Sequence, residues 1–279
     1  MRKITAHEIS CAVAKSCIEA NYKLSDDIVQ AIKTSLDSET NERAKDVLER
    51  LLENLDMAQK EKMAICQDTG MAVIFVRLGQ NVFVEGDIET AINEGVKTGY
   101  KKGCLRNSVV SDPLRRVNTG DNTPAVIHYE ITKGEKIEIT VAPKGFGSEN
   151  MSAVKMLKPS DGEQGVVDFI VETVEKAASN PCPPIVVGVG IGGTMEKAAV
   201  LSKKALLVPI NYENPDAYYA RLEGEIKNRL NGLGIGPMGW GGDTTALGVN
   251  ILTYPTHIAG LPVAVNISCH VTRHFSVII

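Results

Sequence analysis

The sequence predicts an α+β fold in which mixed and antiparallel sheets are flanked by helices within a single large domain. Helical periodicity dominates the N-terminal third, strand-like alternation begins after it, and short apolar runs alternate with helical stretches in the second half. The 279 residues are 43% hydrophobic and 23% charged, which is ordinary for a globular protein and excludes disordered and fibrous classes. A chain of this length buries a core without disulfide or metal cross-links.

The N-terminal third predicts a layer of helices. Thr5 and Glu8 have the spacing of a capping box ahead of an apolar stripe. The helical period continues over residues 26–36 and 43–55. Asp87 is placed to cap a further helix through its side-chain oxygen.

The middle of the chain predicts strands. Residues 71–79 are rich in β-branched and aromatic side chains. Residues 124–131 and 136–141 look like two strands joined by the turn 132–135, and the second strand alternates strictly between polar and apolar residues, so we expect an antiparallel hairpin with one wet face. The stretch 142–160 is rich in Gly and Pro, and within it residues 144–150 predict a loop.

The second half predicts alternating helices and strands. Ser160 and Glu163 have the spacing of another capping box, and Asn214 with Pro215 predicts the start of a helix that runs to about residue 230. The remaining predicted elements are a buried strand over 185–189, a helix over 194–206, and strands over 244–252 and 261–267.

Charge and hydropathy exclude several classes of function. The formal net charge is −4 and no basic run is long enough for a phosphate-binding stripe, which makes nucleic acid a poor candidate partner. No stretch approaches about 20 apolar residues, and the start of the chain lacks the apolar core of a signal peptide. We therefore expect a cytoplasmic chain.

Residues 188–193 match the pattern G-x-G-x-x-G, follow a predicted strand and precede a predicted helix. Glu213 lies 20 residues beyond Gly193, near the usual place of a ribose-binding acid, so a nicotinamide oxidoreductase is one alternative. The entry through Pro183 and Pro184 is unusual for a first dinucleotide-binding strand. We favour the interpretation that the glycines let a helix pack closely on the strand.

The six cysteines contain no CxxC pair, and a reducing compartment keeps such residues as thiols. Most free cysteines are small buried apolar residues, and Cys11 and Cys17 lie at apolar spacing on a predicted helix. Cys66, Cys182 and Cys269 instead lie beside turn-forming residues. Three such thiolates can bind zinc with a histidine, or an iron–sulfur cluster with one iron lacking a protein ligand, and their spacing does not distinguish the two.

Four segments, in order along essentially the whole chain, together resemble the α subunit of class I, iron–sulfur fumarate hydratases. They are 66–70 (CQDTG), 144–151 (KGFGSENM), 180–193 (NPCPPIVVGVGIGG) and 269–270 (CH). The α subunit of L-tartrate dehydratase is a close relative that shares the first and third segments, whereas residues 119–124 and 147–152 look more like the fumarase branch. Phe146 departs from the triple glycine that is common in the second segment.

The resemblance implies a 4Fe-4S cluster held by Cys66, Cys182 and Cys269, with an open iron that acts as a Lewis acid on L-malate or fumarate. It also implies a single iron–sulfur hydro-lyase α-type catalytic domain over residues 1–279. The matching substrate contacts are Gln67, Arg106 and the glycines Gly145 and Gly147, while Lys144 lends positive charge to the anionic substrate or is a solvated loop lysine.

The resemblance pairs Asp68 with His257 as the proton donor to the leaving hydroxyl. An Asp in D-T-G is also a common turn former, and His270 and His274 are rival histidines that the residues alone do not separate from His257.

The base that removes the C3 proton lies, in one-chain relatives, in a C-terminal domain. We therefore expect a separate β subunit and an α2β2 heterotetramer. An L-tartrate dehydratase subunit and a redox or non-catalytic metal-binding protein are the alternatives.

Overall fold

The computed structural model describes residues 2–279 and confirms the α+β class with mixed and antiparallel sheets. The chain forms two compact units, each assembled from segments that are separate in the sequence. Unit 1 comprises the residues up to Leu24, Asn54–Phe146 and Arg273–Ile279, and unit 2 comprises Ser25–Glu53 and Gly147–Thr272. None of the helices within residues 2–279 is both long and apolar enough to cross a membrane.

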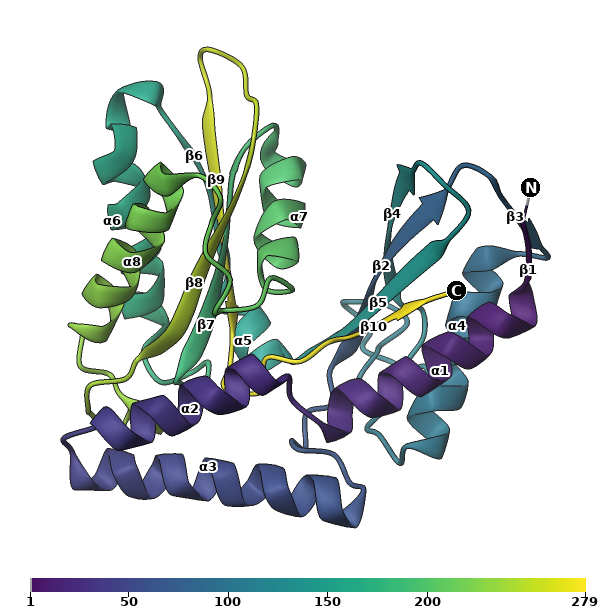
Figure 1. Cartoon of the computed structure of the whole chain (residues 1–279), viewed down its shortest axis with the longest axis horizontal. Helices are drawn as coiled ribbons and strands as arrows, with labels where there is room; N and C mark the ends of the chain where they lie inside the picture. The colour runs from purple at the N-terminus through teal and green to yellow at the C-terminus, as the bar shows by residue number, and fades with distance from the viewer. Residues whose placement is uncertain (1) are drawn as a thin grey trace. The chain divides into compact units, whose positions relative to one another are not determined.

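Unit 1 is a four-stranded sheet with the order β10-β5-β2-β4, covered on one face by α1 and α4 (Figure 1). Its core consists of apolar side chains from those two helices and from the facing side of β2 and β5. A small parallel pair, β1 with β3, completes the unit. The elements are β1 (Arg2–Thr5), α1 (Ala6–Tyr22), β2 (Met71–Gly79), β3 (Val82–Glu85), α4 (Ile88–Lys102), β4 (Val126–Thr132), β5 (Ile137–Lys144) and β10 (Phe275–Ile278).

The N-terminal predictions are confirmed in detail. The Thr5 side chain accepts from the backbone N–H of Glu8 at 3.2 Å, and the Glu8 carboxylate accepts from the N–H of Thr5 at 2.7 Å, which is the predicted capping box. Asp87 caps α4 by accepting from the N–H of Thr90 at 2.6 Å. Strand β2 spans the residues predicted for it.

The predicted hairpin is wrong. Strands β4 and β5 both form, but β2 lies between them, parallel to β4 and antiparallel to β5. Strand β2 is buried on both faces from Ala72 to Val76, so it takes the interior of the sheet. Strand β4 takes the edge, where Tyr129 and Ile131 stay exposed. Thr140 of β5 is also buried, so the alternation of that strand does not mark a wet face.

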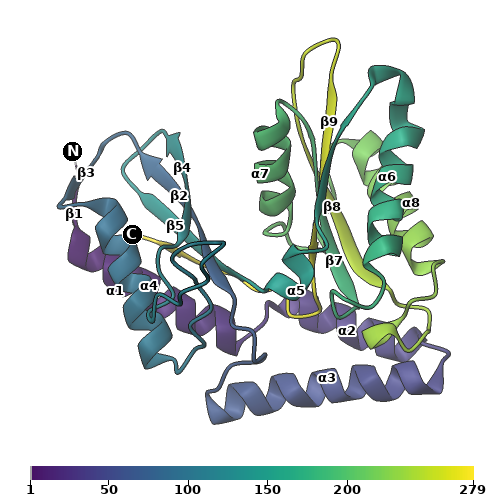
Figure 2. The same ribbon diagram turned by 180° about the vertical axis from the view of Figure 1, so that it is seen from behind.

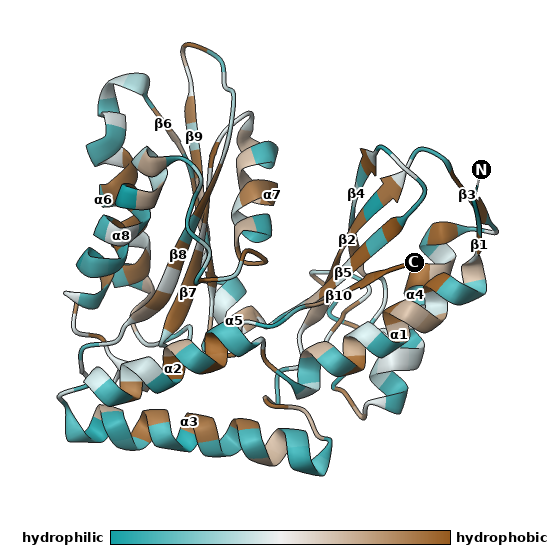
Figure 3. Ribbon diagram, in the orientation of Figure 1, coloured by the Kyte–Doolittle hydropathy of each residue, from teal (hydrophilic) through white to brown (hydrophobic). Residues whose placement is uncertain are grey.

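Unit 2 has three layers, in which α6 and α8 cover one face of a second four-stranded sheet and α7 covers the other (Figures 1 and 2). The strand order is β6-β9-β7-β8, and the apolar residues of these strands lie between the helices (Figure 3). The elements are α2 (Asp26–Ser38), α3 (Glu42–Glu61), which continues into unit 1, α5 (Phe146–Glu149), β6 (Ala153–Leu157), α6 (Gly162–Ala177), β7 (Ile185–Gly192), α7 (Met195–Ala205), α8 (Ala217–Asn231), β8 (Ala246–Tyr254) and β9 (Leu261–Ser268).

Two predicted helix starts in unit 2 are wrong. A short 3-10 turn, Pro159–Asp161, precedes α6, and Glu163 accepts from Arg221 at 2.8 Å instead of closing a capping box with Ser160. Helix α8 is capped by Asp216, two residues later than expected.

The predicted loop 144–150 also differs from the structure, because it contains the short helix α5. Strand β6 follows in the same Gly- and Pro-rich stretch, and the ammonium group of its Lys155 lies over the ring of Phe169, 5.5 Å from the centroid.

The glycines of β7 have the packing role predicted for them. A Cβ at Gly188 would lie 2.1 Å from the carbonyl oxygen of Ser202, and a Cβ at Gly190 would lie 2.1 Å from that of Ala198. Both oxygens belong to α7, so the absence of side chains on β7 is what lets that helix lie against the strand.

Replacing Gly190 by alanine is therefore expected to destabilise unit 2 by about 1–3 kcal/mol, because either α7 or β7 must move to admit the methyl group. Denaturation in urea, followed by circular dichroism, measures the loss. Gly224→Ala in α8 is the matched control: a Cβ there meets nothing within 4 Å, so a gain of about 0.5–1 kcal/mol is expected from helix propensity. Equal effects at the two sites would contradict this packing argument.

Candidate active site

The topology of unit 1 gathers the predicted site segments at one end of its sheet. Strand β2 starts directly after Gly70, and its first residue, Met71, pairs with Lys144, the last residue of β5. Strand β4 enters parallel to β2 at this end, and β10 enters antiparallel to β5. The loops before β2, after β5 and before β4 and β10 therefore all meet there.

Within this cluster of loops, Asp68 is held by main-chain donors. Its Oδ1 accepts from the N–H of Gly70 at 3.0 Å, and its Oδ2 accepts from the N–H of Phe146 at 3.0 Å. Gly70 has a φ of +75°, and a Cβ there would lie 2.7 Å from the backbone of Lys144. A Cβ on Gly145 would lie 3.1 Å from Oδ2 of Asp68. The glycines thus let the two loops approach closely, and Asp68 joins them.

A second contact places Arg106 beside the same loop. The buried Thr69 hydroxyl accepts from the N–H of Arg106 at 2.9 Å and donates to its carbonyl oxygen at 3.3 Å. The Arg106 side chain is exposed, as is that of Gln67. The buried Tyr100 supports this loop: its hydroxyl lies 2.9 Å from the carbonyl oxygen of Thr69 and 3.0 Å from that of Gly70. Burial raises the pKa of Tyr100 far above that of a free phenol, so it remains a donor.

The fumarase-like segment 119–124 belongs to this framework. Asn122 is fully buried, donates to the carbonyl oxygen of Gly70 at 3.1 Å and accepts from the N–H of Ser108 at 2.7 Å. It therefore connects the segment to the Cys66–Gly70 loop and to the chain that follows Arg106. Sequence analysis did not single out Asn122; its position in a turn-forming N-T-P stretch is the signal that could have done so.

Arg273 is a second residue that sequence analysis missed. It is 6% exposed, and its Nη2 donates to the main-chain oxygen of Asp68 at 2.5 Å. Its Nε and Nη1 are buried and, among residues 2–279, have no hydrogen-bond partner. A buried cation without a counter-ion is costly. With the 7% exposed Lys144 and the exposed Arg106, it makes the surroundings of the Asp68 loop strongly cationic.

Unit 2 brings Cys182 and Cys269 to one end of its sheet. Cys182 lies three residues before β7, Cys269 directly follows β9, and these strands are antiparallel with Val186 paired to Ser268. The ring Nδ1 of His270 lies 3.0 Å from the carbonyl oxygen of Cys182, so this rival histidine clamps the two cysteine loops together. Cys182 has a φ of +53°, a strained value for a residue with a Cβ.

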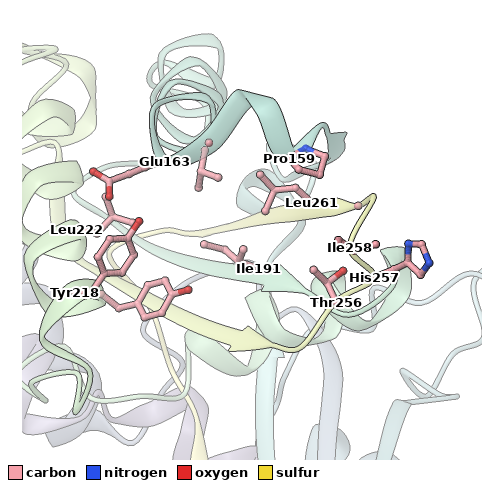
Figure 4. Close-up of a pocket in the computed structure, with 13 residues that line it drawn as sticks. Pro159, Glu163, Ile191, Tyr218, Leu222, Thr256, His257, Ile258 and Leu261 are labelled. Atoms are coloured by element: carbon pink, nitrogen blue, oxygen red, sulfur yellow. The ribbon is translucent and has the colours of Figure 1, made fainter.

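His257 lies at the opposite end of that sheet, in the loop between β8 and β9. The preceding residue, Thr256, donates to the carbonyl oxygen of Gly193 just beyond β7 at 2.9 Å. His257 is exposed, and its Nδ1 accepts from the N–H of Ala259 at 3.2 Å. It stands at the margin of a cavity of about 360 Å³ whose far side carries Tyr218 (Figure 4). Within unit 2, the length of the sheet therefore separates His257 from Cys182 and Cys269.

The remaining cysteines differ in part from the packing role expected for them. Cys17 is fully buried, and burial raises its pKa to about 12. Cys11 is exposed, so that expectation is wrong for it, and Cys104 is exposed as well. None of the six cysteines forms a disulfide bond.

The family follows from comparison of the whole chain with known proteins. Residues 10–278 match the family model Fumerase, described as fumarate hydratase (Fumerase). The chain belongs to this family. Its members are iron–sulfur hydro-lyases, and the resemblance predicted from the four segments is confirmed.

Two relatives of the chain are named as α subunits of L(+)-tartrate dehydratase. The chain is 42% identical over 273 residues to the putative L(+)-tartrate dehydratase subunit alpha of Methanocaldococcus jannaschii, covering 95% of each chain. It is 35% identical over 271 residues to the L(+)-tartrate dehydratase subunit alpha of Escherichia coli strain K12, covering 96% of this chain and 89% of that one.

The donors available to a cofactor in this Fumerase-family chain are divided between the units. Cys66 belongs to unit 1, whereas Cys182 and Cys269 belong to unit 2. Among residues 2–279, no three His, Cys, Asp or Glu side chains form a group that could hold a metal ion. Two features nevertheless fit an iron–sulfur cluster: the three cysteines lie in loops and form no disulfide bond, and the buried guanidinium of Arg273, whose Nε and Nη1 have no hydrogen-bond partner among residues 2–279, suits a cofactor of net negative charge.

Proposed function

We propose that this chain is the α subunit of a hydro-lyase that interconverts fumarate and L-malate at a 4Fe-4S cluster bound by Cys66, Cys182 and Cys269. The observation that supports this most is the set of residues gathered at one end of the unit 1 sheet. There a fixed carboxylate, Asp68, lies among the cationic side chains that a dicarboxylate requires.

Each residue of this set has a role in binding the substrate. The exposed guanidinium of Arg106 binds a substrate carboxylate through two parallel hydrogen bonds, and Gln67 donates its side-chain amide beside it. Lys144 adds positive charge from within the fold. Gly145 and Gly147 offer their main chain to the substrate, and a Cβ at Gly147 would have no neighbour nearer than 3.7 Å, so space is open there.

When it is bound, the cluster supplies a Lewis acid that stabilises hydroxide as a leaving group. The resemblance assigns Asp68 and His257 together as the donor of the proton that the leaving hydroxyl receives, with the carboxylate orienting the imidazole. The base that takes the C3 proton is placed on a separate β subunit, and the assembly is α2β2. The names of the relatives, which are α subunits, support the existence of that partner.

Both units serve this one reaction, so that residues 1–279 act as a single catalytic domain. Short stretches of chain connect the residues of the two units. Cys269 precedes Arg273 by four residues, and Gly145 precedes Gly147 by two.

L(+)-tartrate is the second candidate substrate, and the names of the relatives favour it. Fumarate is preferred because segments 119–124 and 147–152 resemble the fumarase branch. The buried Asn122 ties the first of them into the Asp68 framework. Initial rates of the holoenzyme on L-malate and on L(+)-tartrate decide between the two, and at least a tenfold preference in kcat/KM for malate is expected.

The cluster itself is tested by replacing one of its proposed ligands. Anaerobic reconstitution of the wild-type chain is expected to give about four irons and four sulfides per chain, and Cys182→Ala is expected to lose most of both. Cys11→Ala is the matched control, because Cys11 is an exposed thiol on α1. A folded wild-type chain that binds no iron, or a Cys182→Ala variant that retains it, would contradict the proposed ligand set.

A further inference from the structure

Strand β4 is an open edge of the unit 1 sheet. It is the last strand in the order β10-β5-β2-β4, and no strand among residues 2–279 pairs with its outer side (Figure 1). Its seven residues, Val126–Thr132, include neither Pro nor Lys, the residues that commonly keep an edge strand from pairing. Tyr129 is 45% exposed and Ile131 is 63% exposed. An edge of this length and composition is suited to pair with a further strand.

The other edges of the two four-stranded sheets are protected. Strand β10, at the opposite edge of the unit 1 sheet, is only four residues long. In unit 2, the edge strand β6 carries Lys155, and helix α2 contacts the edge strand β8. Short length, a lysine and a covering helix all hinder pairing with another chain. Within residues 2–279, β4 is the edge without such protection.

The sequence of β4 is complementary to itself when two copies run antiparallel. If Tyr129 lies opposite Tyr129 of a second copy, Ile127 lies opposite Ile131 and His128 lies opposite Glu130. Directly opposed side chains share a face of the sheet, with Cβ atoms about 4.5–5.5 Å apart. Ile127 packs against the core beneath α1 and α4, so the apolar pairs lie on the helix side and the two His–Glu pairs on the other face.

Neighbouring strands support the two polar side chains of this pairing. The His128 ring stacks on Phe75 of β2, with 5.0 Å between the ring centroids and 21° between the planes. Glu130 is in register with Arg77, whose guanidinium donates to Glu138 of β5 at 2.7 Å. A row of alternating charge therefore runs across the sheet to the β4 edge, and His128 of a second copy would continue it.

We propose that β4 pairs antiparallel with β4 of a second copy of this chain, across a two-fold axis at Tyr129, and joins two four-stranded sheets into one. A self-complementary surface of this kind is what a two-fold dimer requires. An axis at Glu130 would set two glutamates opposite each other, and an axis at His128 would set two histidines opposite each other. Only the axis at Tyr129 forms both His–Glu pairs. The pairing does not depend on the proposed reaction.

The oligomeric state of the full chain tests this pairing. In sedimentation velocity the wild-type chain is expected to be a dimer. Ile131→Lys is expected to weaken the dimer by at least about tenfold, since the symmetric interface contains the substitution twice and each lysine faces Ile127. Met156→Lys is the matched control, because Met156 is 57% exposed on β6, the edge strand of the other unit.

Circular dichroism checks that both variants fold. Met156→Lys is expected to leave the dimer unchanged. A monomeric wild-type chain, or a dimer that Ile131→Lys leaves intact, would overturn the proposal. A dimer that the two lysine variants weaken equally would overturn it as well.

Cysteine cross-linking tests the register in the otherwise unaltered chain. Under mild oxidation Tyr129→Cys is expected to form a disulfide with its own counterpart, since the two lie directly opposite each other. Val126→Cys is the matched control: Val126 is also exposed, but it lies opposite Thr132 and about 20 Å from its counterpart. Mass spectrometry of the linked peptides separates these products from links between the native cysteines. Equal cross-linking at the two positions, or none at residue 129, would overturn the proposed axis.

Discussion

Asp68→Asn in the holoenzyme is expected to lower kcat for L-malate by about 10³-fold or more, because the amide neither holds nor relays the proton that the leaving hydroxyl needs. The substitution is nearly isosteric, and Oδ1 still accepts from the N–H of Gly70. At the second position, an NH2 group replaces Oδ2 and faces the N–H of Phe146, donor against donor. This mismatch is expected to cost about 1–3 kcal/mol of stability.

The activity loss and the stability loss are separated by measurement. Steady-state kinetics on malate gives kcat and KM, iron analysis gives the cluster content, and urea denaturation gives the stability. Asp121→Asn is the matched control, because Asp121 is also a carboxylate in unit 1 that accepts hydrogen bonds, from Thr123, and these bonds lower its pKa. It is expected to change kcat less than twofold. An Asp68→Asn holoenzyme with full cluster content and a kcat within threefold of the wild type would contradict the proton-donating role.

Local patterns predicted most of the elements of this fold because their causes are local. The capping box of Thr5 with Glu8 forms within one turn of helix, and strand β2 is identified by its own β-branched run. The role of Gly188 and Gly190 was also predictable, since glycines in an apolar strand before a helix imply close approach.

Strand pairing was not predictable, because it depends on competition between segments. Residues 124–131 and 136–141 are separated by only a four-residue turn, and 136–141 alternates strictly, yet β2 is apolar on both faces and lies between the two strands. The strand β10 was equally hidden, since its partner β5 lies more than one hundred residues away.

Site residues that belong to a sequence motif were predictable. Site residues whose role depends on being buried in the fold were not. The resemblance identifies Cys66, Asp68 and Arg106, and the structure places the backbones around them together. Arg273 belongs to the polar stretch after Cys269, but nothing in its sequence neighbourhood indicates that it is buried against the Asp68 carbonyl. That contact exists because β10 returns to unit 1 at the same end of the sheet.

A buried carboxylate in unit 2 gives the largest expected effect on stability. Glu39 is 3% exposed and follows α2. Its Oε1 accepts from the N–H groups of Thr40, Asn41 and Asp243 at 3.1, 3.1 and 2.9 Å. Its Oε2 accepts from Asp243 at 3.0 Å and from Thr244 at 3.3 Å. One side chain therefore satisfies the turn between α2 and α3 and the loop before β8.

Glu39→Ala is expected to lower the free energy of unfolding of unit 2 by about 3–5 kcal/mol, because the N–H groups of four residues lose this acceptor at once. Glu39→Gln keeps one carbonyl oxygen and is expected to cost about half as much. Urea denaturation followed by circular dichroism measures the stability loss of both variants. Trp240, the only tryptophan, lies in unit 2, so its fluorescence reports on the unfolding of that unit.

Glu42→Ala is the matched control, since Glu42 is a glutamate of the same segment whose side chain is 86% exposed and pairs only with Lys45 on the surface. Its loss is expected to cost no more than about 0.5 kcal/mol, as for other exposed ion pairs within a helix. If Glu39→Ala and Glu42→Ala destabilise the chain equally, water rather than Glu39 satisfies the main chain at residues 40–41 and 243–244. A large difference would instead establish that a single buried carboxylate joins α2, α3 and the approach to β8, and so holds one side of the unit that carries Cys182 and Cys269.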